Sequence, residues 1–265
     1  MIKSKPSLVA LVTGSSRGIG RETAKVLAKA GYQIVLNGKN PETLEETRLQ
    51  FESEGIKARS YAADVTNIEE VQSMFNWIKD NLGRLDILIT NASLTMEAEF
   101  EATDPEAFRK VVDSHIYGSI FPIKIALEEI KANKGSIILI SSLAGIHGLP
   151  RFSAYCTGKM AITAFWQSLR IEQRGTGLHL GLVHLAFVKN DQCKTLINAK
   201  GELEKMPPRP TGMQQPQEMV AKGIYKAIKI RKGRTVLSLY GKTFSLAARF
   251  IPHILQLFIL KFFKA

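Results

Sequence analysis

The chain has 265 residues, of which 45% are hydrophobic, and a formal net charge of +12. This length suits a single large α/β domain with a sizeable core. The two cysteines, Cys156 and Cys193, exclude a disulfide framework and fit a reducing compartment. The first apolar run is too short for a signal-peptide core, so we expect a cytoplasmic protein.

The excess of basic over acidic residues limits the classes of binding partner. A net positive charge suits nucleic acid, an anionic membrane or an anionic cofactor. The densest basic cluster lies at residues 226–234, without a nucleic-acid motif or interleaved aromatic residues. A solvated helix face explains it best, and we expect no nucleic-acid partner.

Short apolar runs alternate with longer amphipathic stretches along the chain. The apolar runs predict strands at residues 8–12, 33–37, 58–62, 85–89, 137–140, 178–185 and 235–239. The stretches between them predict helices at 18–30, 42–54, 69–81, 105–132, 154–174 and 216–231. The helix at 105–132 is expected to be interrupted at Gly118 and Pro122. This alternation predicts an α/β fold with a doubly wound parallel sheet of the Rossmann type, as one domain at 1–241 followed by an apolar amphipathic tail at 242–265.

A glycine-rich turn joins the first predicted strand to the first predicted helix. Its sequence is Thr13-Gly14-Ser15-Ser16-Arg17-Gly18-Ile19-Gly20. Glycines in such a turn let backbone amides approach a pyrophosphate at the helix N-terminus. The turn therefore predicts a dinucleotide-binding site.

The end of the second predicted strand bears on the choice of cofactor. Proteins that prefer NAD usually place an acid there to hold the ribose 2′-hydroxyl. This chain has Gly38 and Lys39 instead, and Arg17 lies in the glycine-rich turn. Two cations without a carboxylate favour a 2′-phosphate, and therefore NADP(H).

A second group of polar residues follows the apolar run at 137–140. Ser142 is expected at the carboxyl end of that strand, where open α/β sheets bind their ligands. Tyr155 and Lys159 are four residues apart and share one face of a helix. A nearby ammonium lowers the pKa of a phenol from about 10, so such a Tyr can exchange a proton with a substrate oxygen near neutral pH.

The glycine-rich turn, followed by Ser142, Tyr155 and Lys159, resembles the short-chain dehydrogenase/reductase family over roughly residues 6–240. The resemblance implies an oxidoreductase that moves hydride between nicotinamide and a carbonyl or alcohol carbon. Tyr155 would be the acid/base, Lys159 would lower its pKa and hold the ribose, and Ser142 would orient the substrate oxygen. No metal site is predicted. Cofactor contacts are implied for Gly14, Ser16, Arg17, Gly18, Ile19, Gly20, Lys39, Asp64, Val65, Asn91, Ala92, Tyr155, Lys159, Val188 and Asn190.

The chain departs from the family's pattern at four places. Thr90 and Ser93 replace the first and last residues of an Asn-Asn-Ala-Gly motif, and three changes fall together at residues 185–190. His115 stands where the family has an Asn, and it is either a proton relay or a packed residue. These departures leave open a second function, a cofactor-binding sensor or scaffold without turnover. The complete set of serine, tyrosine and lysine argues against that alternative.

Two segments suggest how substrate and partners are bound. Residues 192–215 show no clear periodicity, and we predict a substrate lid there. The stretch 254–263 is apolar on nearly every side of a helix, so we expect it to be buried and not to lie free in water. A membrane surface is favoured over the substrate opening or a neighbouring subunit because the chain is basic. Such a tail suits a lipid-like substrate, and the family resemblance implies a homodimer or homotetramer through the helices at 105–131 and 154–174.

Overall fold

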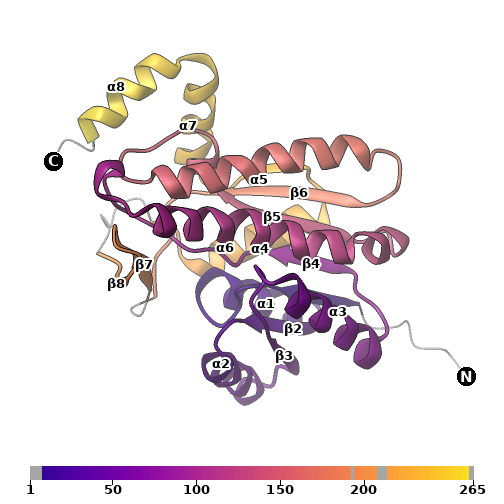
Figure 1. Ribbon diagram of the computed structural model, residues 1–265. Helices are drawn as coiled ribbons and strands as arrows, with labels where there is room; N and C mark the ends of the chain where they lie inside the picture. Colours follow the sequence, from indigo (N-terminus) through magenta and orange to yellow (C-terminus); the bar gives the residue numbers. More distant parts are fainter. Residues whose placement is uncertain (1–7, 192–193, 208–213, 263–265) are drawn as a thin grey trace, which may run out of the picture.

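The computed structural model describes residues 8–191, 194–207 and 214–262, and its centre is a seven-stranded parallel sheet (Figure 1). The strand order is β3-β2-β1-β4-β5-β6-β9, which reverses beside β1, so the sheet is doubly wound as predicted. The strands are β1 (Val9–Val12), β2 (Gln33–Gly38), β3 (Ala58–Ala62), β4 (Ile87–Thr90), β5 (Ser136–Ser142), β6 (His179–Leu185) and β9 (Arg234–Val236).

The central strands are covered on both faces. Every residue of β1, β4 and β6 is buried, as are the first six residues of β5. Strands buried on both faces carry continuous Val, Ile and Leu instead of an alternating pattern. Short unbroken apolar runs were therefore the correct sequence signal for this sheet.

Helices form one layer on each face of the sheet, and each layer has its own hydrophobic core. The first layer consists of α1 (Gly18–Lys29), α2 (Pro41–Ser53) and α6 (Gln217–Lys229). The second layer consists of α3 (Ile68–Leu82), α4 (Pro105–Ala132) and α5 (Ser153–Glu172). The architecture is a single Rossmann-type α/β domain, and the predicted fold class is confirmed.

Helix α4 differs from the prediction. Gly118 and Pro122 were expected to interrupt it, but the helix continues through both residues. Asp104 caps its N-terminus by accepting hydrogen bonds from two backbone amides, and Pro105 occupies the first turn, where no amide donor is needed. Pro122 is buried in the core, so packing compensates for the amide that proline lacks.

The last predicted strand is shorter than expected. β9 ends at Val236, and the chain enters α7 (Leu239–Phe250). The cap of α7 is Ser238, whose Oγ accepts a hydrogen bond from the Gly241 amide at 2.8 Å. This cap starts a helix inside the apolar run that predicted a strand at 235–239.

The predicted lid also contains regular structure. β7 (Thr195–Ile197) and β8 (Leu203–Lys205) pair as an antiparallel hairpin. Residues 192–193, with Cys193, and residues 208–213 lie outside the described residues. The expected lack of regular structure is therefore wrong at 195–197 and 203–205, and the substrate lid itself stays a prediction.

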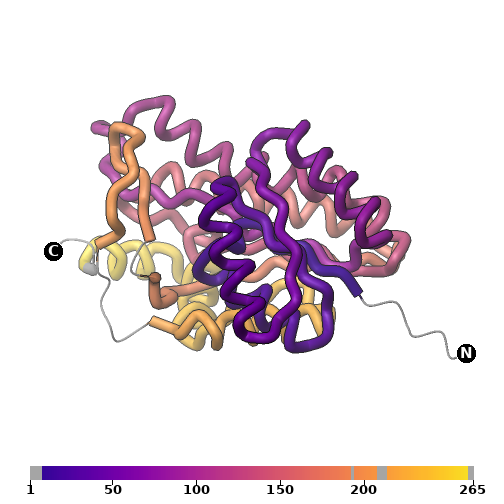
Figure 2. The backbone as a smooth tube through the Cα atoms, turned by 90° about the horizontal axis from the view of Figure 1, so that it is seen from below, coloured from indigo at the N-terminus to yellow at the C-terminus, as the bar shows by residue number. Residues whose placement is uncertain are grey.

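The predicted tail forms two helices, with residues 263–265 outside the described part. α7 ends at Phe250, and Pro252 opens α8 (Pro252–Phe262). Within the described residues, none of the helices has both the length and the hydropathy needed to cross a membrane. α8 lies at the same end of the molecule as the β7–β8 hairpin, opposite the N-terminus, in both views (Figures 1 and 2).

Candidate functional site

The glycine-rich turn is pressed against the chain that follows β4. Gly14 has a φ of 62°, and a Cβ added there would lie 2.7 Å from the Cα of Ala92. Gly18 has the same φ, which L-residues with side chains rarely adopt. A side chain at Gly14 would therefore push the turn away from residues 91–92.

Hydrogen bonds fix residues 91–92 to the same turn. The Asn91 Nδ2 donates to the carbonyls of Thr13 and Gly14 at 3.1 and 3.0 Å. The Oγ1 of Thr13 accepts hydrogen bonds from the Asn91 and Ala92 amides at 3.0 and 3.2 Å. The side-chain amide of Asn91 is thus used to hold the turn, and its predicted ribose contact would have to come from its other atoms.

The remaining turn residues lie between α1 and α2. Ser16 is half-buried, and its carbonyl accepts a hydrogen bond from Thr47 at 2.6 Å. Ile19 packs against the core of the first helix layer, and Gly20 is buried beneath the turn. Arg17 is exposed at the start of α1.

The N-terminus of α1 holds a carboxylate that the sequence did not identify. The Gly18 amide donates to Oδ2 of Asp191 at 2.8 Å, and Gln217 donates to Oδ1 at 2.8 Å. The guanidinium of Arg21 lies 4.0 Å from the same carboxylate. Helix N-termini attract anions through their amides and dipole, so Asp191 occupies a position suited to a phosphate. Gly18 and Asp191 are 173 positions apart, and no local pattern marks this pair.

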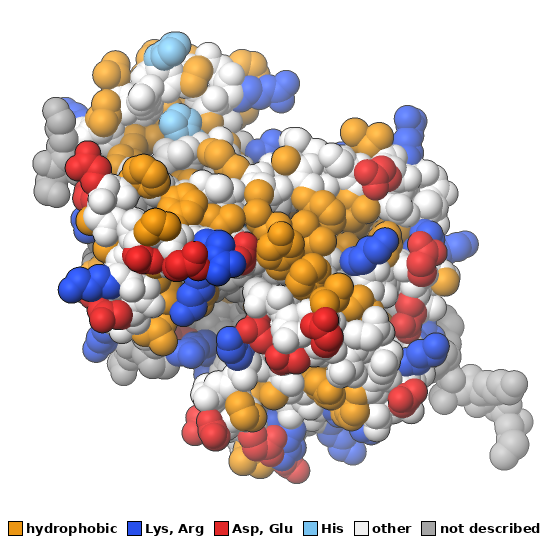
Figure 3. All heavy atoms as spheres, in the orientation of Figure 1, with side chains coloured by type: hydrophobic (Ala, Val, Ile, Leu, Met, Phe, Trp, Pro, Cys, Tyr) orange, Lys and Arg blue, Asp and Glu red, His pale blue; other side chains and the backbone are white. Residues whose placement is uncertain are grey.

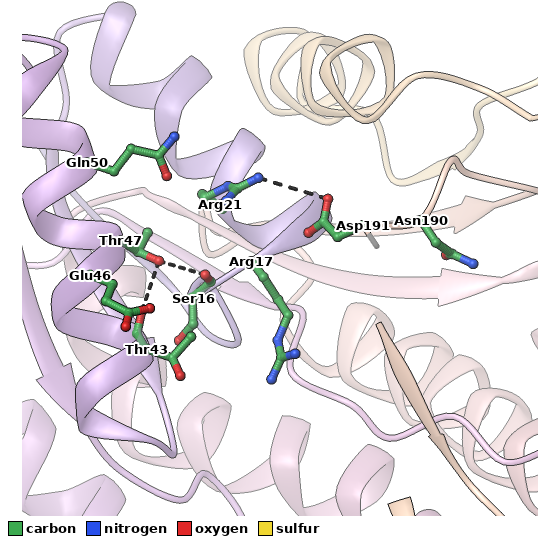
Figure 4. Close-up of a pocket in the computed structure, with 9 residues that line it drawn as sticks. All are labelled: Ser16, Arg17, Arg21, Thr43, Glu46, Thr47, Gln50, Asn190 and Asp191. Carbon is green, nitrogen blue, oxygen red and sulfur yellow. Dashed lines mark hydrogen bonds and ion pairs between the residues drawn. The ribbon is translucent and has the colours of Figure 1, made fainter. Parts of the chain in front are cut away.

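A pocket of about 490 Å³ opens beside this contact (Figure 4). Arg21 and Asp191 lie next to each other at one side of it, and Thr47 links Ser16 to Thr43 at the other side. The pocket borders the glycine-rich turn and is not lined by Tyr155 or Lys159 of α5. Its lining consists of Ser16, Arg17, Arg21, Thr43, Glu46, Thr47, Gln50, Asn190 and Asp191.

Lys39 forms an ion pair with Asp64 that the sequence analysis did not predict. Its Nζ lies 2.6 Å from Oδ2 of Asp64, and the other carboxylate oxygen accepts two hydrogen bonds from Thr66. Burial alone would raise the pKa of Asp64, but the hydrogen bonds from Lys39 and Thr66 outweigh it and lower that pKa. The inference that no carboxylate stands near Lys39 is therefore wrong, because Asp64 comes from the end of the neighbouring strand β3. Asp64 is not the cap of α3, a role that Asn67 takes. Val65 is buried in the core of the second helix layer.

Ser142 ends β5 and caps the short 3₁₀ helix at Leu143–Gly145, where its Oγ accepts a hydrogen bond from the Ala144 amide. Beneath it lies His184, another residue that the sequence did not single out. The Nδ1–H of His184 donates to the Ser142 carbonyl at 2.9 Å, and its Nε2 accepts from Arg234 at 3.2 Å. Burial lowers the pKa of His184 to about 4, against the opposing effect of the Ser142 carbonyl. A neutral histidine thus supports the backbone at Ser142.

Tyr155 and Lys159 lie one turn apart on α5, as their spacing predicts. The Nζ of Lys159 is 5.7 Å from the centre of the Tyr155 ring and donates to the Ile140 carbonyl on β5 at 2.9 Å. Burial, followed by repulsion from Lys194, lowers the pKa of Lys159 to about 7. Its bond to Ile140 fixes α5 against the strand that ends in Ser142.

His115 lies against the same tyrosine. The two rings are 5.1 Å apart at 81°, and a Cβ added to Gly158 would lie 2.5 Å from Cδ2 of His115. Neither ring nitrogen has a hydrogen-bond partner among the described residues. Burial, followed by repulsion from the ammonium of Lys159, lowers the pKa of His115 well below its usual value. His115 is therefore both packed and adjacent to Tyr155, and it is neutral at neutral pH.

The loop after β6 is tied to the segment beyond it. Val188 is buried and forms a β-bridge with Gln215. Asn190 is half-buried, and its Nδ2 donates to the sulfur of Met206 at 3.1 Å. The loop at 185–190 is thereby held between β6 and the hairpin region.

The comparisons with known proteins agree with this geometry. A family model described as short chain dehydrogenase matches residues 8–200, which is more than half of the chain. The chain belongs to the short-chain dehydrogenase/reductase family. It is thereby an oxidoreductase of a family that binds a nicotinamide cofactor, and the predicted resemblance is confirmed.

Two relatives illustrate the range of this family. The chain is 30% identical over 213 residues to a 3-oxoacyl-[acyl-carrier-protein] reductase of Synechocystis, covering 80% of this chain and 85% of the relative. It is 29% identical over 231 residues to dehydrogenase/reductase SDR family member 7B of Xenopus tropicalis, covering 84% of this chain and 75% of the relative.

Solved structures share the fold. A short-chain dehydrogenase from Streptomyces avermitilis superimposes with a TM-score of 0.82 at 22% identity, covering 97% of both chains. An alcohol dehydrogenase from Thermococcus sibiricus, complexed with 5-hydroxy-NADP, has a TM-score of 0.76 at 21% identity, covering 88% of this chain and 97% of that one. A short-chain dehydrogenase/reductase from Burkholderia phymatum, in complex with NAD, has a TM-score of 0.79 at 18% identity, covering 95% of both chains. One of these neighbours is thus complexed with a derivative of NADP and another with NAD.

Proposed function

We propose that this protein is an NADP(H)-dependent oxidoreductase that interconverts a carbonyl and an alcohol. The observation that carries the proposal is the joint position of Ser142, Tyr155 and Lys159. Tyr155 and Lys159 share one turn of α5, and Lys159 bonds to the carbonyl of Ile140, two residues before Ser142. A sensor or scaffold without turnover has no evident need for this arrangement.

The proposed roles follow from the chemistry of the side chains. When bound, the cofactor supplies or accepts the hydride at nicotinamide C4. In the reductive direction, the phenol of Tyr155 gives its proton to the substrate oxygen as that oxygen gains negative charge. In its charged form, the ammonium of Lys159 favours the phenolate that remains. The hydroxyl of Ser142 donates a hydrogen bond to the same oxygen and orients it.

The turn before α1 fits the phosphates of a dinucleotide. Its glycines leave no side chain between the backbone and a ligand, and the Gly18 amide already binds an anionic oxygen, that of Asp191. Arg17 and Lys39 are the cations that would hold a 2′-phosphate. Lys39 would then exchange its ion pair with Asp64 for the phosphate.

The choice of cofactor is tested with a double variant, Arg17→Ser with Lys39→Ser. We expect NADPH affinity to fall about tenfold or more, while NADH affinity is nearly unchanged, with a larger difference at low salt. Lys110→Ser, on the exposed surface of α4, is the matched control for charge and should have no effect. Equal losses for both cofactors would show that these two cations do not select the 2′-phosphate.

Apolar side chains beside Ser142 support an apolar substrate. Leu143 is buried in one cluster with Phe244 of α7, and the cluster includes Ile146, Leu149 and Ala186 at its margin. A surface built from these residues offers few polar partners to a bound substrate. We therefore propose a carbonyl or alcohol carried on an apolar body as the substrate class.

The outer face of α4 and α5 supports a homodimer or homotetramer. Tyr117 of α4 and Met160 of α5 are exposed, and Phe121 and Phe165 are only partly buried. Figure 3 shows a continuous hydrophobic area over these two helices. Patches of this kind on a soluble domain commonly mark a protein interface.

The proposed reaction is tested by following NADPH oxidation against a panel of apolar and polar carbonyl compounds. We expect turnover with at least one apolar carbonyl. Tight NADPH binding without turnover on any member, or on the matching alcohols with NADP, would favour the sensor instead.

A further inference from the structure

The exposed hydrophobic side chains of this protein are concentrated on its last two helices. Among the described residues, 18 large hydrophobic side chains are exposed, and eight of them fall between residues 239 and 260. These eight are Leu239, Leu246, Phe250, Ile251, Ile254, Leu257, Phe258 and Leu260. So many exposed hydrophobic side chains on so short a segment indicate a surface that binds another molecule.

α8 has an inner and an outer apolar face. Leu255 and Ile259, four residues apart, are buried with Phe244 of α7. Ile254 and Leu257 point away from that cluster and are 62% and 67% exposed. Packing against the domain therefore uses only one side of α8, and the other side remains apolar.

The same end of the sequence is strongly basic. Residues 219–265 contain ten Lys or Arg and no Asp or Glu, so they carry +10 of the net charge of +12. Within the two helices, Lys242, Arg249 and Lys261 are exposed. Lys261 follows Ile254 and Leu257 at the helical spacing of one face, so cationic and apolar groups occur together there.

We propose that α7 and α8 form a docking surface for an anionic lipid bilayer. A helix with exposed apolar side chains and flanking cations lies in the membrane interface, where the apolar groups enter the acyl boundary and the cations meet lipid phosphates. α8 has 11 residues, about half of the roughly 20 that a spanning helix needs. The protein would rest on the bilayer without crossing it.

The charges favour a bilayer over a second copy of the chain. A twofold contact pairs a surface with itself, so it would bring Lys242, Arg249 and Lys261 toward the same cations of the partner. No carboxylate side chain in residues 219–265 could neutralise them. Anionic lipid headgroups provide the opposite charge over a wide area.

The docking surface is the outer side of the α7–α8 pair. The inner side of this pair faces the proposed substrate region. The ring of Phe244 lies 6.3 Å from that of His147, and the ring of Tyr240 lies 6.0 Å from that of Phe187. Figure 1 shows the α7–α8 pair projecting from the domain, and Figure 3 shows hydrophobic side chains over it. If the proposed function holds, an apolar substrate would pass from the bilayer to Ser142 along α7. The docking itself does not depend on catalysis.

Sedimentation of the full chain with vesicles tests the proposal. We expect binding to vesicles of equimolar phosphatidylcholine and phosphatidylglycerol, weakening with added salt, and little binding to phosphatidylcholine alone. The double variant Ile254→Asp with Leu257→Asp should bind at least about tenfold more weakly. Leu49→Asp, at a 51% exposed site on α2, should bind like the wild type. Circular dichroism and NADPH binding confirm that each variant is folded.

Two results would overturn the proposal. One is a wild-type chain that ignores the anionic vesicles, whether or not the double variant changes the oligomeric mass; a changed mass would identify a second copy as the occupant. The other is equal binding by the double variant and Leu49→Asp. Tyr155→Phe should sediment like the wild type, so a failed docking test and a failed proposed function are distinguishable.

Discussion

The glycine-rich turn and the α7–α8 pair border the proposed site from two sides, and they are held in different ways. The turn is fixed by backbone and amide hydrogen bonds to Asn91 and by a glycine that leaves no room for another atom. The α7–α8 pair is held by a small cluster of apolar side chains and leaves much of its apolar surface exposed. Close polar contacts specify one geometry, whereas a few apolar contacts leave a region free to adapt.

This difference suggests that the glycine-rich turn and the α7–α8 pair serve different ligands. A fixed turn suits a cofactor that is the same in every reaction, because a preformed site loses little entropy on binding. An adaptable wall suits substrates that differ in size and an entry route that must open. Three substitutions test whether the two regions differ in this way.

The largest expected effect comes from adding one carbon to the fixed region. In Gly14→Ala, the new Cβ meets the Ala92 Cα at 2.7 Å, and the positive φ is unfavourable for alanine. We expect a loss of about 3–4 kcal/mol in the free energy of unfolding, together with weaker NADPH binding. Leu246→Ala, at an exposed site on α7, should change stability by less than about 0.5 kcal/mol. Denaturant unfolding of both variants measures the difference, and similar losses would break the comparison.

Acid should destabilise the folded chain through His184, which supports the backbone at Ser142. Its pKa is about 4 in the folded chain and about 6.5 when unfolded, so the unfolded chain binds more protons between these values. Stability is therefore fully present above about pH 6.5 and is lost as the pH falls toward 4, by roughly 2 kcal/mol at pH 5. Denaturant unfolding at pH 7 and pH 5 measures this loss. His184→Gln should reduce the pH dependence, and an unchanged slope would show that other groups cause it.

The smallest effect is expected at Asp191, whose carboxylate contacts the Gly18 amide of the fixed turn. The carboxylate accepts a hydrogen bond from this amide, which the proposed function assigns to a cofactor phosphate, so under that proposal the carboxylate would leave when the cofactor binds. Asp191→Asn removes the competing charge, and we expect NADPH to bind about three- to tenfold more tightly. Calorimetry measures the change, with Glu46→Gln in the same pocket as the control. Weaker binding by Asp191→Asn would show that the carboxylate supports the bound state.

The sequence predicted features whose determinants are local. The turn at 13–20, the buried strands and the Tyr155–Lys159 spacing each depend on residues within a few positions of one another. Local rules failed where two signals competed, as at residues 235–239, where a serine cap starts a helix inside an apolar run. They also failed at 195–205, because strands of three residues are too short to show a period.

The site residues that sequence reasoning missed act over long distances. Asp191 reaches Gly18 across 173 positions, and His184 reaches Ser142 and Arg234 across 42 and 50. The carboxylate of Asp64 lies beside Lys39 only because β3 pairs with β2. Such contacts are set by the order of strands in the sheet, which a single sequence does not reveal.

The central claim, hydride transfer with Tyr155 as the proton donor, is tested most directly with NADPH carrying deuterium at the transferable C4 position. The wild-type enzyme should place the deuterium on the carbinol carbon of the alcohol product, as mass spectrometry will show. Tyr155→Phe should bind the cofactor normally and form that product about 10²–10⁴-fold more slowly. Deuterium that stays on the cofactor with every carbonyl, or a Tyr155→Phe variant as fast as the wild type, would contradict the account.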